Sequence, residues 1–168
     1  MGKMPSSKPI IEVRQATADE DLILVRHYRA LWESYGVPDE HIRPDAEAGV
    51  LEFIRESREQ RALGVFLAFV DGEVVGSTAC HKHISPYPEV VLPEHRQFGY
   101  IWHVYADSTL RRQGIGRSLV ERALAHLREN GCTTAVLHSS PAGEKLYAEL
   151  GFQLAKEMRL GLSTDPSA

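Results

Sequence analysis

The segment from Arg111 to Arg117 has the composition of a site that binds an anion. It reads Arg-Arg-Gln-Gly-Ile-Gly-Arg and leads into a stretch whose apolar residues keep helical spacing. The first N–H groups of a helix have no partner within it, and with the helix dipole they attract negative charge. Gly114 and Gly116 allow the backbone to approach a bulky phosphate closely, and the arginines add positive charge. The segment therefore predicts a loop that binds a phosphate or pyrophosphate.

Two other phosphate-binding motifs fit this segment poorly. A Walker loop would continue with Gly-Lys-Ser or Gly-Lys-Thr, and this segment does not. The dinucleotide-binding fingerprint has a third glycine, which is absent after Gly116. Two glycines alone are also compatible with a capped surface helix that binds nothing.

Tyr147 and three histidines are the side chains that could carry protons. A phenol with a pKa near ~10 is protonated at neutral pH and can supply a proton to a leaving group. The alternative for Tyr147 is simple packing, because it lies among leucines at helical spacing. His81 and His83 share one face of an expected strand, either as a structural pair or as half of a metal site.

His103 lies in the strand expected before the glycine loop. Strand alternation places it on the opposite face from Tyr100 and Trp102, unless a bulge intervenes. No residue is assigned as a general base from the sequence, and His83 and His103 stay the two candidates.

The composition excludes several classes of protein. The chain has 168 residues and a formal net charge of −4, which disfavours a nucleic-acid partner because phosphates require a basic face. No stretch approaches the ~20 apolar residues that cross a bilayer, so we expect no membrane partner. Cys80 and Cys132 show no CxxC spacing, which favours a reducing compartment and a cytoplasmic location. We expect no bound metal.

The pattern of elements predicts an α/β (α+β) fold with a mixed sheet. The expected strands are Ile10–Gln15, Val65–Val70, Glu73–Ile84, Gly99–Ala106, Cys132–His138 and Phe152–Leu162. The expected helices run from Thr17 to Gly36, from Ala46 to about Arg61, from Ile115 to Asn130 and from Pro141 to about Gly151. Asp71-Gly72 predicts a tight hairpin turn, and Ser85–Phe98 an irregular loop. One domain is expected over residues 10–162, with tails at 1–9 and 163–168.

Two motifs together resemble the GNAT superfamily of N-acetyltransferases. The first is R-x-x-G-x-G at Arg111–Gly116, between a strand and a helix, and the second is L-Y-x-x-x-G-F at Leu146–Phe152. The resemblance extends to the element order over nearly the whole chain. It implies a single-domain fold with a mixed sheet of about six or seven strands, about four helices and a splayed pair of parallel strands.

The resemblance also assigns roles to residues. It implies that acetyl-CoA is the co-substrate and that the backbone of Val104, Tyr105 and Ala106 pairs with its pantetheine arm, with the Val104 amide at the thioester oxygen. Tyr147 matches the tyrosine beside the cofactor sulfur, and Ser140 stands near a position where relatives have a pantetheine-binding asparagine. The pyrophosphate would be held by Arg111, Arg112, Gln113, Gly114, Ile115, Gly116 and Arg117.

The function implied by the resemblance is acetyl transfer to a primary amine, by direct attack in a ternary complex. The first alternative is a catalytically idle acyl-CoA-binding sensor or interaction module. The second is transfer to oxygen, or of a longer acyl group. The acceptor is expected to be a small-molecule or peptide amine, in a pocket formed by the first two helices and the loop Ser85–Phe98. A homodimer is the default expectation. Carboxylates make a cationic amine plausible, namely Asp39, Glu40, Asp45, Glu47, Glu89 and Glu94.

Overall fold

The computed structural model describes residues 9–162, which divide into two units, the first ending at His138 and the second beginning at Ser139. The expected tails at 1–9 and 163–168 lie outside the described residues, apart from Pro9. The single domain expected over residues 10–162 stays a prediction.

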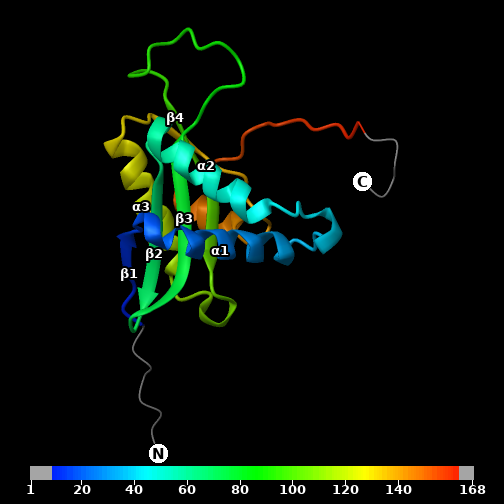
Figure 1. Ribbon diagram of the computed structural model, residues 1–168. Helices are drawn as coiled ribbons and strands as arrows, with labels where there is room; N and C mark the ends of the chain where they lie inside the picture. Colours follow the sequence, from blue (N-terminus) through cyan, green and yellow to red (C-terminus); the bar gives the residue numbers. More distant parts are fainter. Residues whose placement is uncertain (1–8, 163–168) are drawn as a thin grey trace, which may run out of the picture. The chain divides into compact units, whose positions relative to one another are not determined.

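A five-stranded mixed sheet forms the centre of the first unit (Figure 1). Its order follows the chain from β1 to β5, with antiparallel neighbours as far as β4 and a parallel β4–β5 pair. This is the mixed sheet with a parallel pair that the sequence predicted. The strands are β1 (Glu12–Gln15), β2 (Gly64–Val70), β3 (Glu73–Lys82), β4 (Phe98–Ala106) and β5 (Thr134–Val136).

Helices of the first unit cover both faces of the sheet. The α-helices in the described part of this unit are α1 (Asp21–Ser34), α2 (Ala46–Gln60) and α3 (Ile115–Glu129), and short 3₁₀ turns lie at Ala18–Glu20, Asp39–His41 and Ser108–Leu110. The second unit contains α4 (Glu144–Glu149). In β2, Val65 and Leu67 belong to a buried cluster with Leu24 of α1 and Ile54 of α2. Phe66, between them, contacts His126 of α3 instead. Alternate residues of β2 therefore fill the cores on the two faces.

Local sequence signals set the ends of several elements. Asp71 (φ 51°) and Gly72 (φ 82°) both have the left-handed backbone that a tight hairpin turn between β2 and β3 requires. The predicted capping box between Thr17 and Glu20 is present, and in it the Thr17 N–H donates to Glu20 Oε2 at 2.9 Å. Both predictions are confirmed.

A β-bulge interrupts β4 at Trp102. Ala79 of β3 pairs with His103 and Cys80 pairs with Ile101, so Trp102 is an extra residue in β4. The Trp102 and His103 rings consequently lie on the same side, at 5.2 and 5.8 Å from the ring of Tyr28 in α1. The bulge is the exception to strict alternation that the sequence analysis named for His103.

A chain of three polar side chains runs from α1 through β3 to β4. His27 Nδ1 and His103 Nε2 each lie 2.8 Å from Ser77 Oγ. His103 is 1% exposed, and its Nδ1 has no hydrogen-bond partner among the described residues. Burial lowers the pKa of His103 to about 3 and also lowers the pKa of His27. Both imidazoles are therefore neutral at pH 7.

The second unit contains α4 and an extended segment. The α4 helix starts at Glu144, three residues after the expected Pro141, because Pro141–Gly143 form a turn closed by the Gly143 N–H and Ser140 O. The expected strand Phe152–Leu162 is wrong, and so is the count of six or seven strands. Its apolar residues do alternate, but this unit offers no strand to pair with among its described residues. The exposed members are Leu154, Met158, Leu160 and Leu162.

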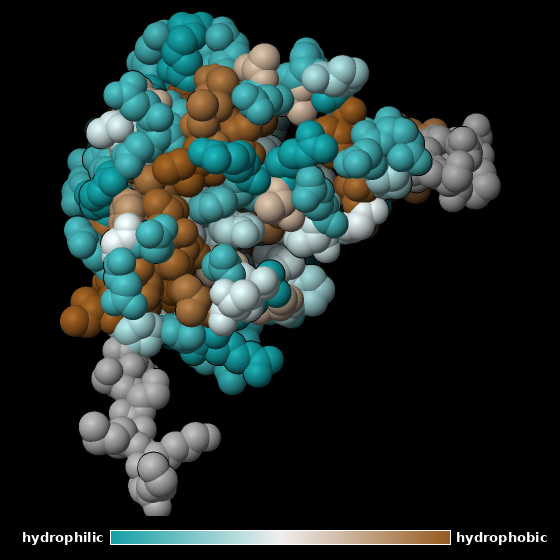
Figure 2. All heavy atoms as spheres, turned by 60° about the horizontal axis from the view of Figure 1, so that its bottom comes forward, coloured by the Kyte–Doolittle hydropathy of each residue, from teal (hydrophilic) through white to brown (hydrophobic). Residues whose placement is uncertain are grey.

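Several hydrophobic side chains of α1 also reach the surface. Leu22 is 46% exposed and Trp32 is 41% exposed. Figure 2 shows hydrophobic atoms, in brown, between hydrophilic ones, in teal, on the face it presents. Within residues 9–162, none of the helices combines the length and the apolar character that crossing a membrane would require.

The buried His103 makes the stability depend on pH. In the unfolded chain this imidazole takes up a proton below its ordinary pKa of 6.5, whereas in the folded chain it does so only near 3. The unfolded state binds more protons in between, so the free energy of unfolding falls as the pH drops below 6.5. Between pH 7 and pH 5 the free energy of unfolding should fall by about 2 kcal/mol less in His103→Gln than in the wild-type protein. Urea unfolding at the two pH values measures this free energy.

The control for this experiment is His95→Gln, which changes an exposed histidine in the loop before β4. If the free energy of unfolding falls equally in both variants between pH 7 and pH 5, the pH dependence does not come from His103.

Candidate active site

The parallel pairing between β4 and β5 is short and leaves part of β4 open. β5 ends opposite Tyr100, and β4 runs on to Ala106 without it. The Asp107 N–H donates to the Val75 carbonyl of β3. Successive amides of a strand point to opposite edges, so those of Ala106 and Val104 point to the edge of β4 that β5 does not cover. An extended group with its own donors and acceptors can bind there as an added strand would. The sequence analysis named this stretch for the pantetheine arm.

The loop after β4 begins with an ordered turn. Asp107 Oδ1 accepts hydrogen bonds from the Thr109 N–H at 2.8 Å and from the Thr109 hydroxyl at 2.7 Å. These hydrogen bonds lower the pKa of Asp107, which stays ionised at neutral pH. The turn joins the open edge of β4 to the start of α3.

The glycine loop presents the N-terminus of α3. Arg112 (φ 64°) and Gly114 (φ 97°) have left-handed backbone, and Gly114 is the N-cap of the helix. Gly76 of β3 brings the helix close to the sheet, since a Cβ there would lie 2.9 Å from Ile115 Cγ2 and 2.7 Å from Tyr105 O. The first amides of α3 thus lie near the open end of β4. This arrangement fits a phosphate group.

The residues of the loop differ in exposure. Arg111, Arg112 and Gly114 are exposed, Gln113, Gly116 and Arg117 are partly exposed, and Ile115 is buried as the anchor of the helix. Arg117 also lies 3.8 Å from Glu121 of the same helix. The exposed guanidinium groups are placed to add positive charge around the loop.

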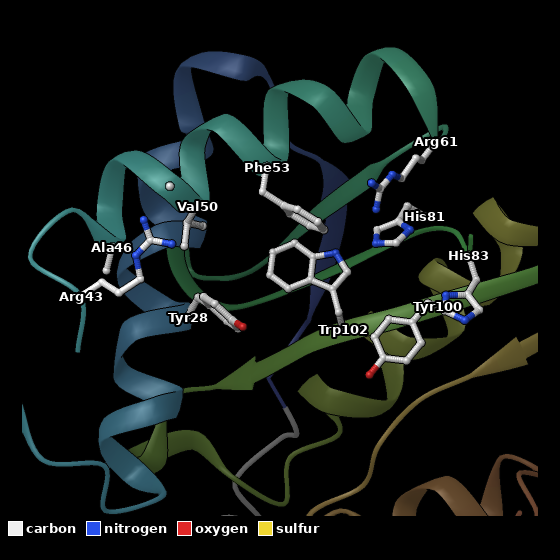
Figure 3. A pocket seen from close by; sticks show the side chains of 11 residues that line it. Tyr28, Arg43, Ala46, Val50, Phe53, Arg61, His81, His83, Tyr100 and Trp102 are labelled. Atoms are coloured by element: carbon white, nitrogen blue, oxygen red, sulfur yellow. The ribbon is translucent and has the colours of Figure 1, made fainter. Parts of the chain in front are cut away.

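A pocket of about 500 Å³ lies between the two N-terminal helices and the sheet (Figure 3). Phe53 of α2 packs edge-on against Trp102, with ring centres 5.5 Å apart, and Tyr28 of α1 does the same from its side at 5.2 Å. The pocket and the open edge share β4, because Trp102 lines the first and Val104 belongs to the second. The lining residues are Tyr28, Arg43, Ala46, Gly49, Val50, Phe53, Arg61, His81, His83, Tyr100 and Trp102.

His81 is the lining residue best suited to accept a proton. Its Nδ1 lies 2.8 Å from the Lys82 carbonyl, which can only accept, so Nδ1 carries the hydrogen and Nε2 has the lone pair. Burial lowers the pKa of His81, and the charge of Arg61 adds to the effect. The imidazole is therefore neutral at pH 7. From the sequence, His81 is only one of a pair with His83 on one strand face, and its place as a candidate base comes from the structure.

The two histidines that were named lie differently. His83 lines the pocket, and its ring centre is 5.7 Å from that of Tyr100. His103 is enclosed in the core and does not line the pocket. Its enclosure argues against a role in direct proton transfer from a substrate.

Tyr147 and Ser140 belong to the second unit. The Tyr147 ring packs edge-on against Phe152 at 5.8 Å, and a Cβ on Gly143 would lie only 2.7 Å from the Tyr147 ring. A glycine at this position therefore allows the ring to lie over the start of α4. Ser140 accepts the hydrogen bond that closes the preceding turn.

The charges of the pocket differ from the expectation. The carboxylates expected to favour a cationic amine do not line the pocket. Asp39 pairs with Arg29, and Asp45 pairs with Arg43, which itself lines the pocket. The loop Ser85–Phe98 lines a second, smaller hollow of about 360 Å³, and Glu89 lies there. Over residues 9–162, no group of three metal-ligating side chains accompanies His81 and His83.

Comparisons with known proteins agree with this geometry. Residues 24–152 match the acetyltransferase (GNAT) family. Human N-alpha-acetyltransferase 30 is 34% identical over 99 residues, which cover 55% of this chain and 25% of that protein. Rice glucosamine 6-phosphate N-acetyltransferase 1 is 31% identical over 64 residues, which cover 38% of each chain. The match thus spans well under half the length of these relatives.

Solved structures share the fold. A GCN5-related N-acetyltransferase from Ralstonia eutropha JMP134 has a TM-score of 0.77 at 24% identity, covering 91% of this chain and 99% of that one. A predicted acetyltransferase from Clostridium acetobutylicum, solved with acetyl-CoA, has a TM-score of 0.77 at 19% identity, covering 91% of this chain and 97% of that one. The family match extends over most of the sheet, the glycine loop and α4, and the chain therefore belongs to the acetyltransferase (GNAT) family.

Proposed function

We propose that the protein transfers the acetyl group of acetyl-CoA to a primary amine by direct attack in a ternary complex. The observation that carries the proposal is the open edge of β4 beside the pocket that β4 itself lines. The edge would take the pantetheine arm, the glycine loop the pyrophosphate, and the pocket the acceptor. The relatives' names, an N-alpha-acetyltransferase and an amino-sugar N-acetyltransferase, support an amine as acceptor.

Three residues would act in successive steps of the reaction. His81 Nε2 removes a proton from the acceptor ammonium, which leaves a neutral amine to attack the thioester carbonyl. The Val104 N–H stabilises the negative charge that develops on the carbonyl oxygen, an interaction typically worth ~3–4 kcal/mol. Tyr147 protonates the departing thiolate, a role that rests on the family resemblance.

We also propose a cytoplasmic location, because Cys80 and Cys132 are both free thiols, as expected in a reducing compartment. The expected homodimer stays a prediction.

The phosphate loop is tested with acetyl-CoA in a calorimetric titration, with NADH as the control ligand. The wild-type protein should bind acetyl-CoA at micromolar concentrations and bind NADH poorly. Gly114→Val should weaken acetyl-CoA binding by at least ~10-fold, because its side chain would occupy phosphate space and the backbone there is left-handed.

Gly131→Val is the matched control for backbone strain. Gly131 is also left-handed (φ 79°), has nothing within 4 Å of a Cβ, and lies beyond the other end of α3. If both variants lose affinity equally, the loop is not the phosphate site.

His81→Gln tests the base. We expect kcat to fall by ~10²-fold, with acetyl-CoA affinity unchanged, because a glutamine side chain cannot take up the proton. In the wild-type protein, log kcat should fall with decreasing pH only below the ordinary imidazole value of 6.5, because burial lowers the pKa of His81. His83→Gln is the control on the same face of the pocket, and an equal loss of kcat in it would remove His81 from this role.

Tyr147→Phe tests the acid. The acetylation rate, measured as thiol release with a panel of amines, should fall by ~10²-fold while acetyl-CoA affinity stays the same. Tyr35→Phe, an exposed tyrosine after α1, is the control. If Tyr147→Phe releases thiol as fast as the wild-type protein, Tyr147 is not the acid. If the wild-type protein binds acetyl-CoA but releases thiol with none of the amines, the idle sensor is the better description.

A further inference from the structure

We infer that the acceptor carries an anionic group, a carboxylate or a phosphate, close to its amine, together with an apolar body, and that Arg61 binds the anionic group. This inference rests on the proposed function and names the substrate class of the same pocket. It follows from the charges and the rings that line the pocket.

The lining of the pocket is positive and contains no carboxylate. Its charged members are Arg43 and Arg61, and the rest are histidines, aromatic rings and small or aliphatic residues. A purely cationic amine would therefore find no carboxylate among the lining residues and would lie near the guanidinium of Arg61. The lining instead favours a substrate that brings negative charge.

Arg43 is not free to bind that charge. Its Nε and Nη2 lie 2.9 and 2.7 Å from the two carboxylate oxygens of Asp45, a two-pronged ion pair on the exposed side of the pocket. The charge of Arg43 is thus largely balanced within the protein.

Arg61, directly after α2, differs from the two arginines in the last turns of that helix. Arg55 pairs with Glu52 and Glu59, and Arg58 pairs with Asp21 of α1. Arg61 makes no ion pair with any carboxylate in residues 9–162. Within that range its Nε is buried without a hydrogen-bond partner, as is that of Arg58, so the missing counter-charge is what distinguishes Arg61. A partly buried guanidinium without a counter-charge is unfavourable by itself, so a bound anion is its natural partner.

The surroundings of Arg61 place the anion next to the reacting amine. Figure 3 shows its guanidinium beside the His81 ring, and its carbon Cζ lies 5.5 Å from the centre of the Phe53 ring. Its charge is close enough to lower the pKa of His81. An anion held by Arg61 and an amine at His81 would therefore be joined by a short linker.

The aromatic walls define the rest of the acceptor. The rings of Tyr28, Phe53 and Trp102 contact one another edge-on and form the apolar side of the pocket. An apolar or aromatic group on the same linker would cover them. The substrate class is thus a short amino acid or amino phosphate with an apolar side group.

Four probes separate these features. Phenylalanine carries a carboxylate beside its amine, and its phosphonate analogue carries a phosphonate there. Phenylalaninamide has a neutral amide in place of the carboxylate, and 2-phenylethylamine has no such group. The measured quantity is kcat/KM from thiol release, for the wild-type protein, Arg61→Gln and the surface control Arg55→Gln. Amine basicity differs between probes, so the informative quantity is the change in the ratio between two probes on mutation.

We expect Arg61→Gln to lower kcat/KM for an anionic probe by ~10–100-fold, chiefly through KM, and to leave the two probes without an anionic group within ~3-fold. Arg55→Gln should change none of them. The anionic probe that responds, carboxylate or phosphonate, identifies the group. If the ratio of kcat/KM between anionic probes and probes without an anionic group is unchanged in Arg61→Gln, the inference is overturned.

A second measurement separates this inference from the proposed function. The anionic probes are titrated calorimetrically into the protein in the presence of coenzyme A. Binding that is lost in Arg61→Gln, without thiol release in the wild-type protein, supports the anion site and contradicts the transferase. Acetylation of the probes without an anionic group, with the ratio of kcat/KM between the two kinds of probe unchanged in Arg61→Gln, contradicts the anion site and supports the transferase. Anionic probes that neither bind nor react overturn the anion site.

Discussion

The short parallel contact between β4 and β5 is the constraint on which the candidate site depends. It holds the two strands together only as far as Tyr100 and Val136, so β4 continues with one edge open. A longer pairing would satisfy that edge and remove the place for an extended ligand. The bulge at Trp102 acts on the same strand, since it turns the indole ring toward the α1 side of the sheet. One strand thereby supplies both backbone groups for a cofactor and a wall for an acceptor.

The order of the elements and the glycine loop could be predicted from the sequence, because each depends on a local signal. The helical spacing after Gly114, the Asp71-Gly72 turn and the apolar run of β2 all act within a few residues. The segment Phe152–Leu162 has a clear alternation of apolar residues but no strand to pair with among the described residues of its own unit. A strand is stable only when a second segment pairs with it, and the alternation within one segment does not show whether such a partner exists.

The chemistry of the pocket was less predictable for a related reason. The bulge at Trp102 is a mismatch in register between β3 and β4, and nothing in the sequence of β4 alone marks it. The acidic residues of the sequence indicated a cationic acceptor, whereas the structure pairs Asp39 and Asp45 with arginines. Arg61 lacks a carboxylate partner among the described residues while Arg55 and Arg58 have one, a difference that depends on the folded structure and cannot be read from the sequence.

The Ser77 hydroxyl between two imidazoles gives the buried chain a direction. A hydroxyl has one hydrogen, so it can donate to His27 or to His103 but not to both. If it donated to His103 Nε2, the enclosed Nδ1 of that ring would be an N–H without an acceptor, which is rarer in proteins than an unpaired lone pair. The favoured order therefore runs from His103 Nε2–H through the Ser77 hydroxyl to the lone pair of His27 Nδ1. The three side chains form an aligned row of dipoles whose orientation is fixed by its enclosed end.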